Sequence, residues 1–115
     1  MSDSASIVLV LTTVPAGDRG DAIARALVEE RLAACVNVGA PMTSFYRWRG
    51  AVERNDERQV VVKTTRDRLP ALQARLAELH TYEVPEFLVI AVAGGSVPYL
   101  DWITASVQPD RLPSS

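Results

Sequence analysis

The chain has little of the residues that cross-link small proteins through covalent bonds or metal ions. Its 115 residues include a single cysteine, Cys35, and a single histidine, His80. One cysteine excludes a disulfide framework within the chain, and one Cys with one His cannot supply the four ligands of a structural zinc site. The fold must therefore depend on an apolar core, for which 48% hydrophobic residues are sufficient.

The sequence also lacks an excess of charge of either sign and a long apolar run. Twelve Lys and Arg residues against fourteen Asp and Glu residues give a net charge of −2, which excludes the basic surface typical of proteins that bind nucleic acid or anionic lipid. No apolar run approaches the ~20 residues that cross a membrane. The apolar run at 7–11 has no Lys or Arg before it, so it indicates a buried strand rather than a signal peptide. We expect a soluble, cytoplasmic protein with no nucleic-acid or membrane partner.

Motifs typical of enzymes are missing as well. The chain contains no G-x-S-x-G, H-E-x-x-H, C-x-x-C or P-loop pattern. Cys35 lies among alanine and valine residues, far along the chain from the only histidine, and is interpreted as a buried, inert thiol. Gly94-Gly95 is interpreted as a tight turn rather than an anion site. We expect no enzymatic activity.

Hydrophobic periodicity predicts one domain over residues 1–115, with 1–5 and 109–115 loosely ordered. The predicted elements are a strand at 6–13, a helix from Asp18 or Asp21 to Ala33, a long β-hairpin over 36–64 with its tip near Gly50, a helix capped by Asp67 and ending at Leu79, a buried strand at 87–93, and a helix capped by Ser96 and ending at Val107. This β-α-β-β-α-β order with an extra C-terminal helix predicts an α+β, ferredoxin-like sandwich, in which helices cover one face of an antiparallel sheet.

His80 is the strongest single candidate for chemistry, and two interpretations of it stay open. It ends the second predicted helix, where an imidazole can cap the last carbonyl groups. It is also followed by Tyr82, Glu83 and Glu86, a set of side chains suited to a borderline divalent metal such as copper(II). One chain supplies too few ligands for tight binding, so such a site would need a neighbouring subunit.

The aromatic segment at 45–49, Phe-Tyr-Arg-Trp-Arg, has two interpretations. Aromatic side chains interleaved with arginine are found on nucleic-acid-binding surfaces. However, a pI near 5.3 and the absence of the glycine-aromatic pattern of RNA-recognition sheets argue against that function. Tyr, Trp and Arg also anchor subunit contacts. We therefore predict a subunit interface that includes Tyr46 and Trp48.

Several segments, taken in order along the chain, resemble one family. They are residues 29–38 (EERLAACVNV), 44–50 (SFYRWRG), Glu57 and Gln59 with 62–65 (VKTT), 80–86 (HTYEVPE) and 99–102 (YLDW). By this resemblance, which extends from about Ile7 to Val107, the chain is identified as a member of the CutA family, the divalent-cation tolerance proteins. The family usually has Pro where this chain has Thr81, and some members carry Cys and a second His where it has Leu11 and Leu79. His80 is therefore the only one of the family's soft and imidazole ligands that this chain keeps.

The resemblance implies a homotrimer similar in build to the PII-type signalling proteins, with the long hairpins joining the subunits and no established enzymatic activity. It also implies an association with copper and other divalent cations. We expect the connector at 80–86 of one subunit to lie against the hairpin of the next. Each cleft would hold His80, Glu83 and Glu86 as weak metal ligands, with Tyr82, Glu57 and Lys63 beside them.

The predicted function is a non-enzymatic role in divalent metal-ion tolerance. No cofactor is required, and copper(II) or another divalent cation would bind weakly in the clefts between subunits. The alternative is a small-molecule sensor like the PII proteins, for which metals are incidental.

Overall fold

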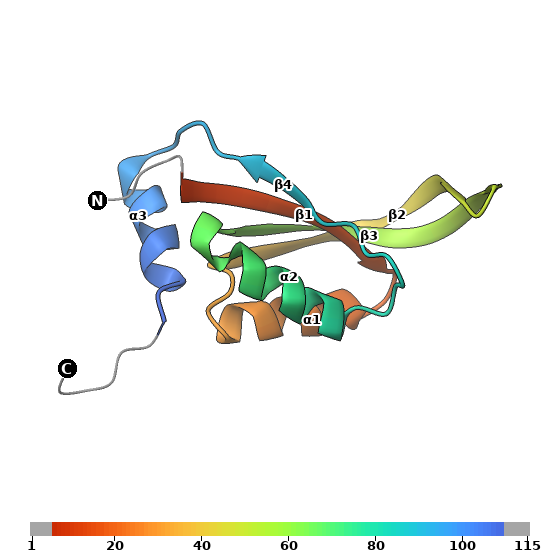
Figure 1. Ribbon diagram of the computed structural model, residues 1–115, viewed down its shortest axis with the longest axis horizontal. Coiled ribbons are helices and arrows are strands. Elements are labelled where there is room, and N and C mark those ends of the chain that lie inside the picture. The colour runs from red at the N-terminus through yellow and green to blue at the C-terminus, as the bar shows by residue number, and fades with distance from the viewer. Residues whose placement is uncertain (1–5, 110–115) are drawn as a thin grey trace.

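A computed structural model describes residues 6–109 as a single sheet with three α-helices (Figure 1). In chain order the elements are β1 (Ile7–Pro15), α1 (Arg19–Glu29), β2 (Cys35–Trp48), β3 (Ala51–Thr65), the 3₁₀ turn η2 (Arg66–Arg68), α2 (Leu69–Leu79), β4 (Leu88–Ala91) and α3 (Val97–Ser106). All strand pairs are antiparallel, and their order in the sheet is β2-β3-β1-β4. The predicted ferredoxin-like fold is confirmed. Of the segments predicted to be loosely ordered, 1–5 and 110–115 lie outside the described residues.

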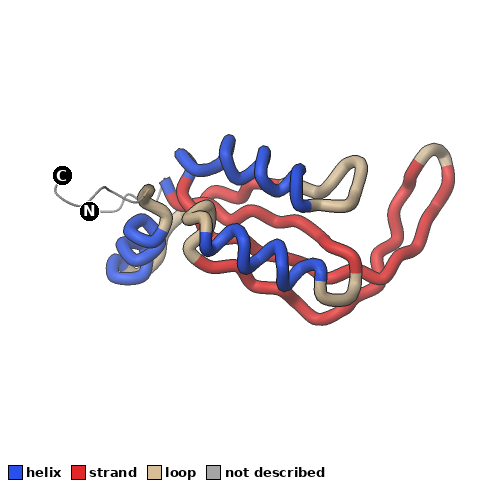
Figure 2. The backbone as a smooth tube through the Cα atoms, turned by 90° about the horizontal axis from the view of Figure 1, so that it is seen from below, coloured by secondary structure: helices blue, strands red, loops and turns tan. Residues whose placement is uncertain are grey.

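Helices α1 and α2 cover one face of the sheet, and α3 lies at the end remote from the hairpin tip (Figures 1 and 2). In β1, Val8, Val10, Thr12 and Val14 are buried while the residues between them are only partly buried, because successive side chains of a strand point to opposite faces. The core under α1 and α2 includes Val10, Val14, Ile23, Leu27, Val60, Val62, Leu72 and Leu76. A second apolar cluster lies under α3 and includes Ile7, Ala34, Leu100 and Ile103.

The outer part of the β2–β3 hairpin projects beyond the helices (Figure 2). Its tip is the predicted Arg49-Gly50 turn, in which both residues have positive φ, 51° and 83°. Two central residues with positive φ make a type I′ turn, whose twist matches that of the paired strands. The hairpin lengthens the molecule to 54 × 30 × 23 Å, and the radius of gyration is 15.5 Å. A compact domain of this length has about 13 Å.

A β-bulge interrupts β2 between Val38 and Pro41. On the near side Val38 pairs with Val60, and on the far side Pro41 pairs with Arg58, so Gly39 and Ala40 together oppose Gln59 alone. The bulge is held from β3, since Nε of Arg58 donates a 2.7 Å hydrogen bond to the carbonyl of Gly39. Beyond it, the even-numbered residues of β2, from Met42 to Trp48, share a face with Glu57.

The first helix ends earlier than predicted, at Glu29 rather than Ala33. Arg31 takes a positive φ of 60°, and the amide of Leu32 donates to the carbonyl of Leu27, which is the pattern of a Schellman cap. Glycine is usual at that position, so the sequence carries no ordinary stop signal there. Asp18 and Ser96 occupy the predicted N-cap positions, although neither side chain makes a cap hydrogen bond.

Two further predictions are corrected by the structure. Asp67 does not cap α2, because it lies within η2, where it accepts a hydrogen bond from the Thr65 hydroxyl, and Arg68 is the N-cap residue. The strand predicted to be buried at 87–93 is instead the edge strand β4, with Leu88 56% and Ile90 44% exposed. An apolar run predicts a strand whose side chains are covered by other apolar groups, but it does not show whether those groups belong to the same chain.

Candidate functional site

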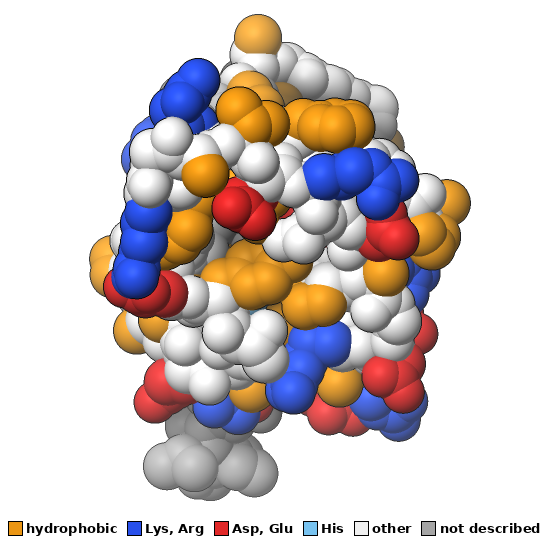
Figure 3. Space-filling model, turned by 90° about the vertical axis from the view of Figure 1, so that its right-hand side faces the viewer, with side chains coloured by type: hydrophobic (Ala, Val, Ile, Leu, Met, Phe, Trp, Pro, Cys, Tyr) orange, Lys and Arg blue, Asp and Glu red, His pale blue; other side chains and the backbone are white. Residues whose placement is uncertain are grey.

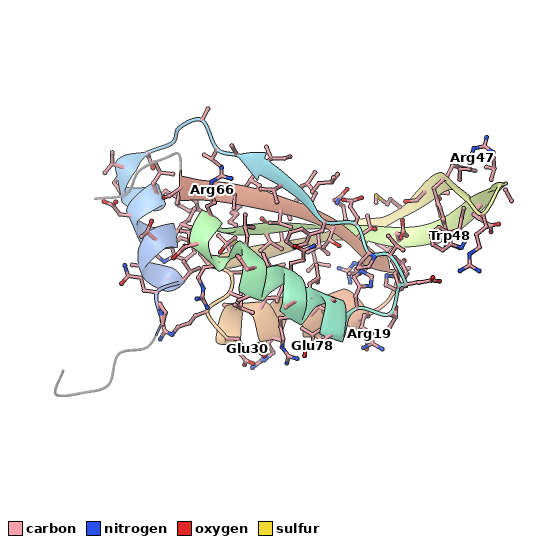
Figure 4. The ribbon with its side chains drawn as sticks, in the orientation of Figure 1. Arg19, Glu30, Arg47, Trp48, Arg66 and Glu78 are labelled. Carbon is pink, nitrogen blue, oxygen red and sulfur yellow. The ribbon has the colours of Figure 1, made fainter. Side chains whose placement is uncertain are left out.

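A cleft of about 750 Å³ lies between the hairpin and the connector that joins α2 to β4. Its lining comes from Thr13 of β1, Met42, Ser44, Phe45, Tyr46 and Trp48 of β2, Asn55, Glu57 and Gln59 of β3, and residues 81–86 of the connector. Figure 3 faces the hairpin end of the molecule and shows apolar side chains gathered in the middle of this face, with acidic groups beside them. Trp48 lies on the hairpin next to its tip (Figure 4).

His80 is buried at the end of α2, where it ties the connector to the sheet. Its backbone amide donates to the carbonyl of Leu76, so it is the C-cap residue of the helix. The ring Nδ1 accepts a 3.1 Å hydrogen bond from the amide of Tyr82, and Nε2 lies 2.6 Å from the carbonyl oxygen of Thr13. Because that carbonyl can only accept, Nε2 is the ring nitrogen that donates in this arrangement. Both ring nitrogens are therefore engaged, and the cap interpretation is the one that fits this geometry.

Glu57 and Tyr82 meet at the inner end of the cleft. Glu57 is only 7% exposed, and its Oε2 accepts a 2.7 Å hydrogen bond from the Tyr82 hydroxyl. Burial, followed by the neighbouring Glu57 carboxylate, raises the pKa of Tyr82 well above the ordinary phenol value. Farther along the hairpin, the side-chain amide of Asn55 donates to the hydroxyl of Tyr46. The cleft is thus lined with polar groups that are already oriented.

The two other predicted carboxylates lie at different places on the connector. Glu83 forms a 3.0 Å ion pair with Arg49 at the hairpin tip, and both side chains are largely exposed. The guanidinium group of Arg49 also lies over the ring of Trp48, 5.3 Å from its centroid. Glu86 is half-buried, and its Oε2 accepts a 3.4 Å hydrogen bond from Gln59, which also donates to the carbonyl of Thr12.

The structure brings some of the predicted site residues together and separates others. Tyr82, Glu57 and Glu86 line the cleft of a single chain, and so do Tyr46 and Trp48, which the sequence suggested as interface residues. Lys63 lies elsewhere on the sheet, where its Nζ contacts the hydroxyl of Tyr99 at 3.5 Å.

Within residues 6–109, no group of three or more His, Cys, Asp and Glu side chains could hold a metal ion. Within one chain, His80, Glu83 and Glu86 therefore do not form one ligand set. Gln59 also lines the cleft, and the sequence indicated it only through the family resemblance. Its alternation with Glu57 along β3 places both side chains on one face.

The profile of the CutA1 divalent ion tolerance protein family matches residues 8–106. The chain belongs to the CutA family. A relative described as divalent-cation tolerance protein CutA, from Thermus thermophilus, is 48% identical over 95 residues, which are 83% of this chain and 92% of that protein. The chain covers only 56% of a chloroplastic CutA from Arabidopsis thaliana, at 36% identity over 88% of its own length. CutA is the family expected from the sequence, and it is not a known enzyme family.

Solved CutA structures share the fold over nearly their whole length. The divalent cation tolerance protein of Thermus thermophilus superposes with a TM-score of 0.86 at 45% identity, over 89% of this chain and 99% of that one. A CutA described as periplasmic, from Archaeoglobus fulgidus, has a TM-score of 0.85 at 31% identity, over 89% and 99% of the two chains. Within residues 6–109 no helix combines the length and apolar character needed to cross a bilayer.

Proposed function

We propose that this chain acts in divalent-cation tolerance as a non-enzymatic protein that binds copper(II), or another divalent cation, weakly in the cleft. The observation that carries the proposal is the placement of Glu57 and Glu86 on one cleft from two different elements. Within the described residues, neither carboxylate forms an ion pair with Lys or Arg, whereas Glu83 has Arg49 as its partner. Carboxylate oxygens without a counter-ion are suitable ligands for a labile divalent cation.

The donor set fits a weak site and does not fit a structural one. A structural transition-metal site needs a closed set of about four ligands. His80 has no free ring nitrogen while its bonds to Tyr82 and Thr13 are intact. Two carboxylates remain, so we expect rapid exchange, stronger binding of copper(II) than of zinc(II), and loss of binding as acid protonates the ligands.

Isothermal titration calorimetry with copper(II) tests this site. The double variant Glu57→Gln, Glu86→Gln keeps the shape of both side chains and removes their charge, and it should bind copper(II) at least about tenfold more weakly. The matched control is Glu29→Gln with Glu78→Gln, which removes two exposed carboxylates from the helices. Equal isotherms for the wild type and the cleft variant would refute the proposed site.

We also propose that three copies assemble, as the family resemblance implies. Leu88 and Ile90 expose apolar side chains on the edge strand β4, and Tyr46 and Trp48 expose theirs on the hairpin. An apolar edge strand left in water invites pairing with another chain, and closed cyclic symmetry limits such pairing to a defined size. Light scattering should give about three chain masses. The double variant Leu88→Lys, Ile90→Lys should be monomeric, whereas Val28→Lys, on an exposed position of α1, should not.

The aromatic wall of the cleft favours a second candidate function, small-molecule sensing of the PII type. Tyr46, Trp48 and Tyr82 line the same cleft as the carboxylates, and a metal site has no need of such a wall. Native mass spectrometry of the protein from its own cells would reveal a co-purifying organic ligand.

Fractionation of the same cells would test the cytoplasmic location that we propose, since one relative is described as periplasmic.

A further inference from the structure

The cleft combines negative charge with aromatic surface. Its described lining includes Glu57, Glu83 and Glu86 and the rings of Tyr46, Trp48 and Tyr82, and it includes no Lys or Arg. Carboxylates would repel an anionic ligand, and aromatic faces attract positive charge through the ring quadrupole. At about 750 Å³ the cleft is also much larger than a bare metal ion needs and lies within the size range of small-molecule sites.

At the rim of the cleft, a cationic side chain of the protein already contacts both an aromatic ring and a carboxylate. The guanidinium group of Arg49 lies 5.3 Å from the ring centroid of Trp48 and 3.0 Å from a carboxylate oxygen of Glu83. One cation therefore uses a ring face and a carboxylate together. Deeper in the cleft, the ring of Tyr82 and the carboxylate of Glu57 again place an aromatic face beside a negative charge. Here, however, no Lys or Arg of the described residues lines the cleft to supply a positive charge.

Glu57 is the strongest indication that a ligand supplies this charge. Its side chain is more than nine-tenths buried, and the only side-chain hydrogen bond that it accepts within residues 6–109 comes from the neutral hydroxyl of Tyr82. A buried carboxylate is costly unless a cation or several donors compensate it, and here the second carboxylate oxygen remains available. Glu86 lines the same cleft, and its single side-chain donor, Gln59, is 3.4 Å away.

We propose that the cleft binds a small organic cation, with an ammonium or guanidinium head and a short carbon chain. The head pairs with Glu57 and Glu86, and the chain lies against the rings of Tyr46, Trp48 and Tyr82. The inference deepens the second candidate function, on which it rests for the choice of cleft, and it does not require copper(II) to bind there.

Four probes with the same carbon chain test the head group directly. n-Butylammonium and n-butylguanidinium carry the positive charge, n-butanol is neutral, and butyrate is negative. Each is titrated into the full chain at constant ionic strength, and the side-chain amide signals of Asn55 and Gln59 report binding in the NMR spectrum. We expect saturable shifts with the two cations only. Equal binding of n-butanol, or binding of butyrate, would overturn the proposal.

Variants then locate the site. Glu57→Gln should weaken n-butylguanidinium binding about tenfold, and Glu86→Gln, at a less buried position, should weaken it severalfold without risk to folding. Glu53→Gln is the matched control, because it removes the same charge from β3 at a residue that does not line the cleft, and it should change affinity less than twofold. Equal losses in all three variants would indicate non-specific attraction and overturn the proposal.

Oligomer mass, measured on the same samples, separates this inference from the functions proposed above. If no cationic probe binds the wild type and Glu57→Gln reduces the trimer, a neighbouring subunit fills the cleft and the inference fails, while the assembly proposal stands. If copper(II) binds through Glu57 and Glu86 but no organic cation does, the inference fails and the metal proposal stands. If the chain is monomeric and still binds the cations, the inference stands and the assembly proposal fails.

Discussion

The hydroxyl group of Tyr82 donates a 2.7 Å hydrogen bond to Oε2 of Glu57, which ties the connector to strand β3. Removing the hydroxyl in Tyr82→Phe leaves the buried carboxylate without its side-chain donor. Such unsatisfied groups cost about 1–3 kcal/mol. We therefore expect Tyr82→Phe to lower the free energy of unfolding by that amount at pH 7 in urea titrations. A variant as stable as the wild type would show that water replaces the lost donor.

The same hydrogen bond predicts an alkaline transition. Because burial and Glu57 raise the pKa of Tyr82 above its ordinary value of 10.0, the folded state holds the phenol proton more tightly than the unfolded state. This contribution to stability is complete below about pH 10 and is lost as pH rises further. The difference in unfolding free energy between the wild type and Tyr82→Phe should therefore shrink above pH 10. Ultraviolet titration should also show a phenol that ionises well above pH 10 in the wild type and is missing from Tyr82→Phe.

Substitution of His80 should reduce stability and leave copper binding unchanged. His80→Ala removes the hydrogen bonds to Thr13 and from the Tyr82 amide at a buried position, for which we expect a loss of about 1–3 kcal/mol. Gln73→Ala, on the exposed side of the same helix, is the control and should be nearly neutral. Equal stability together with lost copper binding would instead make His80 a ligand.

The ion pair between Glu30 and Arg75 should make part of the stability sensitive to acid. Arg75 contacts both oxygens of the Glu30 carboxylate, at 2.9 and 3.0 Å, at the outer side of α1 and α2, where Figure 4 shows Glu30. The hydrogen bond from Arg75 lowers the pKa of Glu30 below 4.5. The stabilisation by this ion pair is present above pH 4.5 and is lost as pH falls through the lowered pKa of Glu30. Unfolding curves of the wild type and Glu30→Gln should differ slightly at pH 7 and converge in acid once Glu30 is protonated in the folded state, and 1 M salt should shrink the difference.

The hairpin tip offers a gain in stability. Arg49 has a positive φ of 51°, a conformation that asparagine adopts more readily than arginine, and Asn-Gly is the favoured pair for a type I′ turn. Arg49→Asn should raise the free energy of unfolding by up to about 1 kcal/mol, since the exposed ion pair with Glu83 that it removes is worth little. Arg49→Ala removes the same ion pair without the backbone preference and should be less stable than the wild type in the same thermal scans.

Most of the fold was predictable because its signals are local. The apolar run of β1, the leucines of α2 and the Arg49-Gly50 turn each identify an element from neighbouring residues alone. The end of α1 was not predictable, because Arg31 takes a positive-φ conformation that is usual for glycine. The exposure of β4 was missed because an apolar strand looks the same whether its cover comes from the same chain or another.

The candidate site was predictable in its residues and not in their pairing. The connector sequence singled out His80, Tyr82 and Glu86, but the two hydrogen bonds of the His80 ring depend on where β1 lies beside the end of α2. Likewise, alternation along β3 places the side chains of Lys63 and Glu57 on the same face of the sheet. The sequence therefore does not show that only Glu57 lines the cleft, which depends on the connector lying against that end of the strand.

The bulge at Gly39 and Ala40 sets the direction of the outer hairpin and not its pairing. Because these two residues oppose Gln59 alone, deleting Ala40 would restore an unbroken ladder in which Pro41 still pairs with Arg58 and Met42 with Glu57. Tyr46 and Trp48 would stay on the face that carries Glu57, but the hairpin would lose the bend and the added twist that a bulge gives a strand. A single lost codon would thus turn the aromatic wall of the cleft relative to the connector in a diverging copy, while leaving the lining residues and the core unchanged.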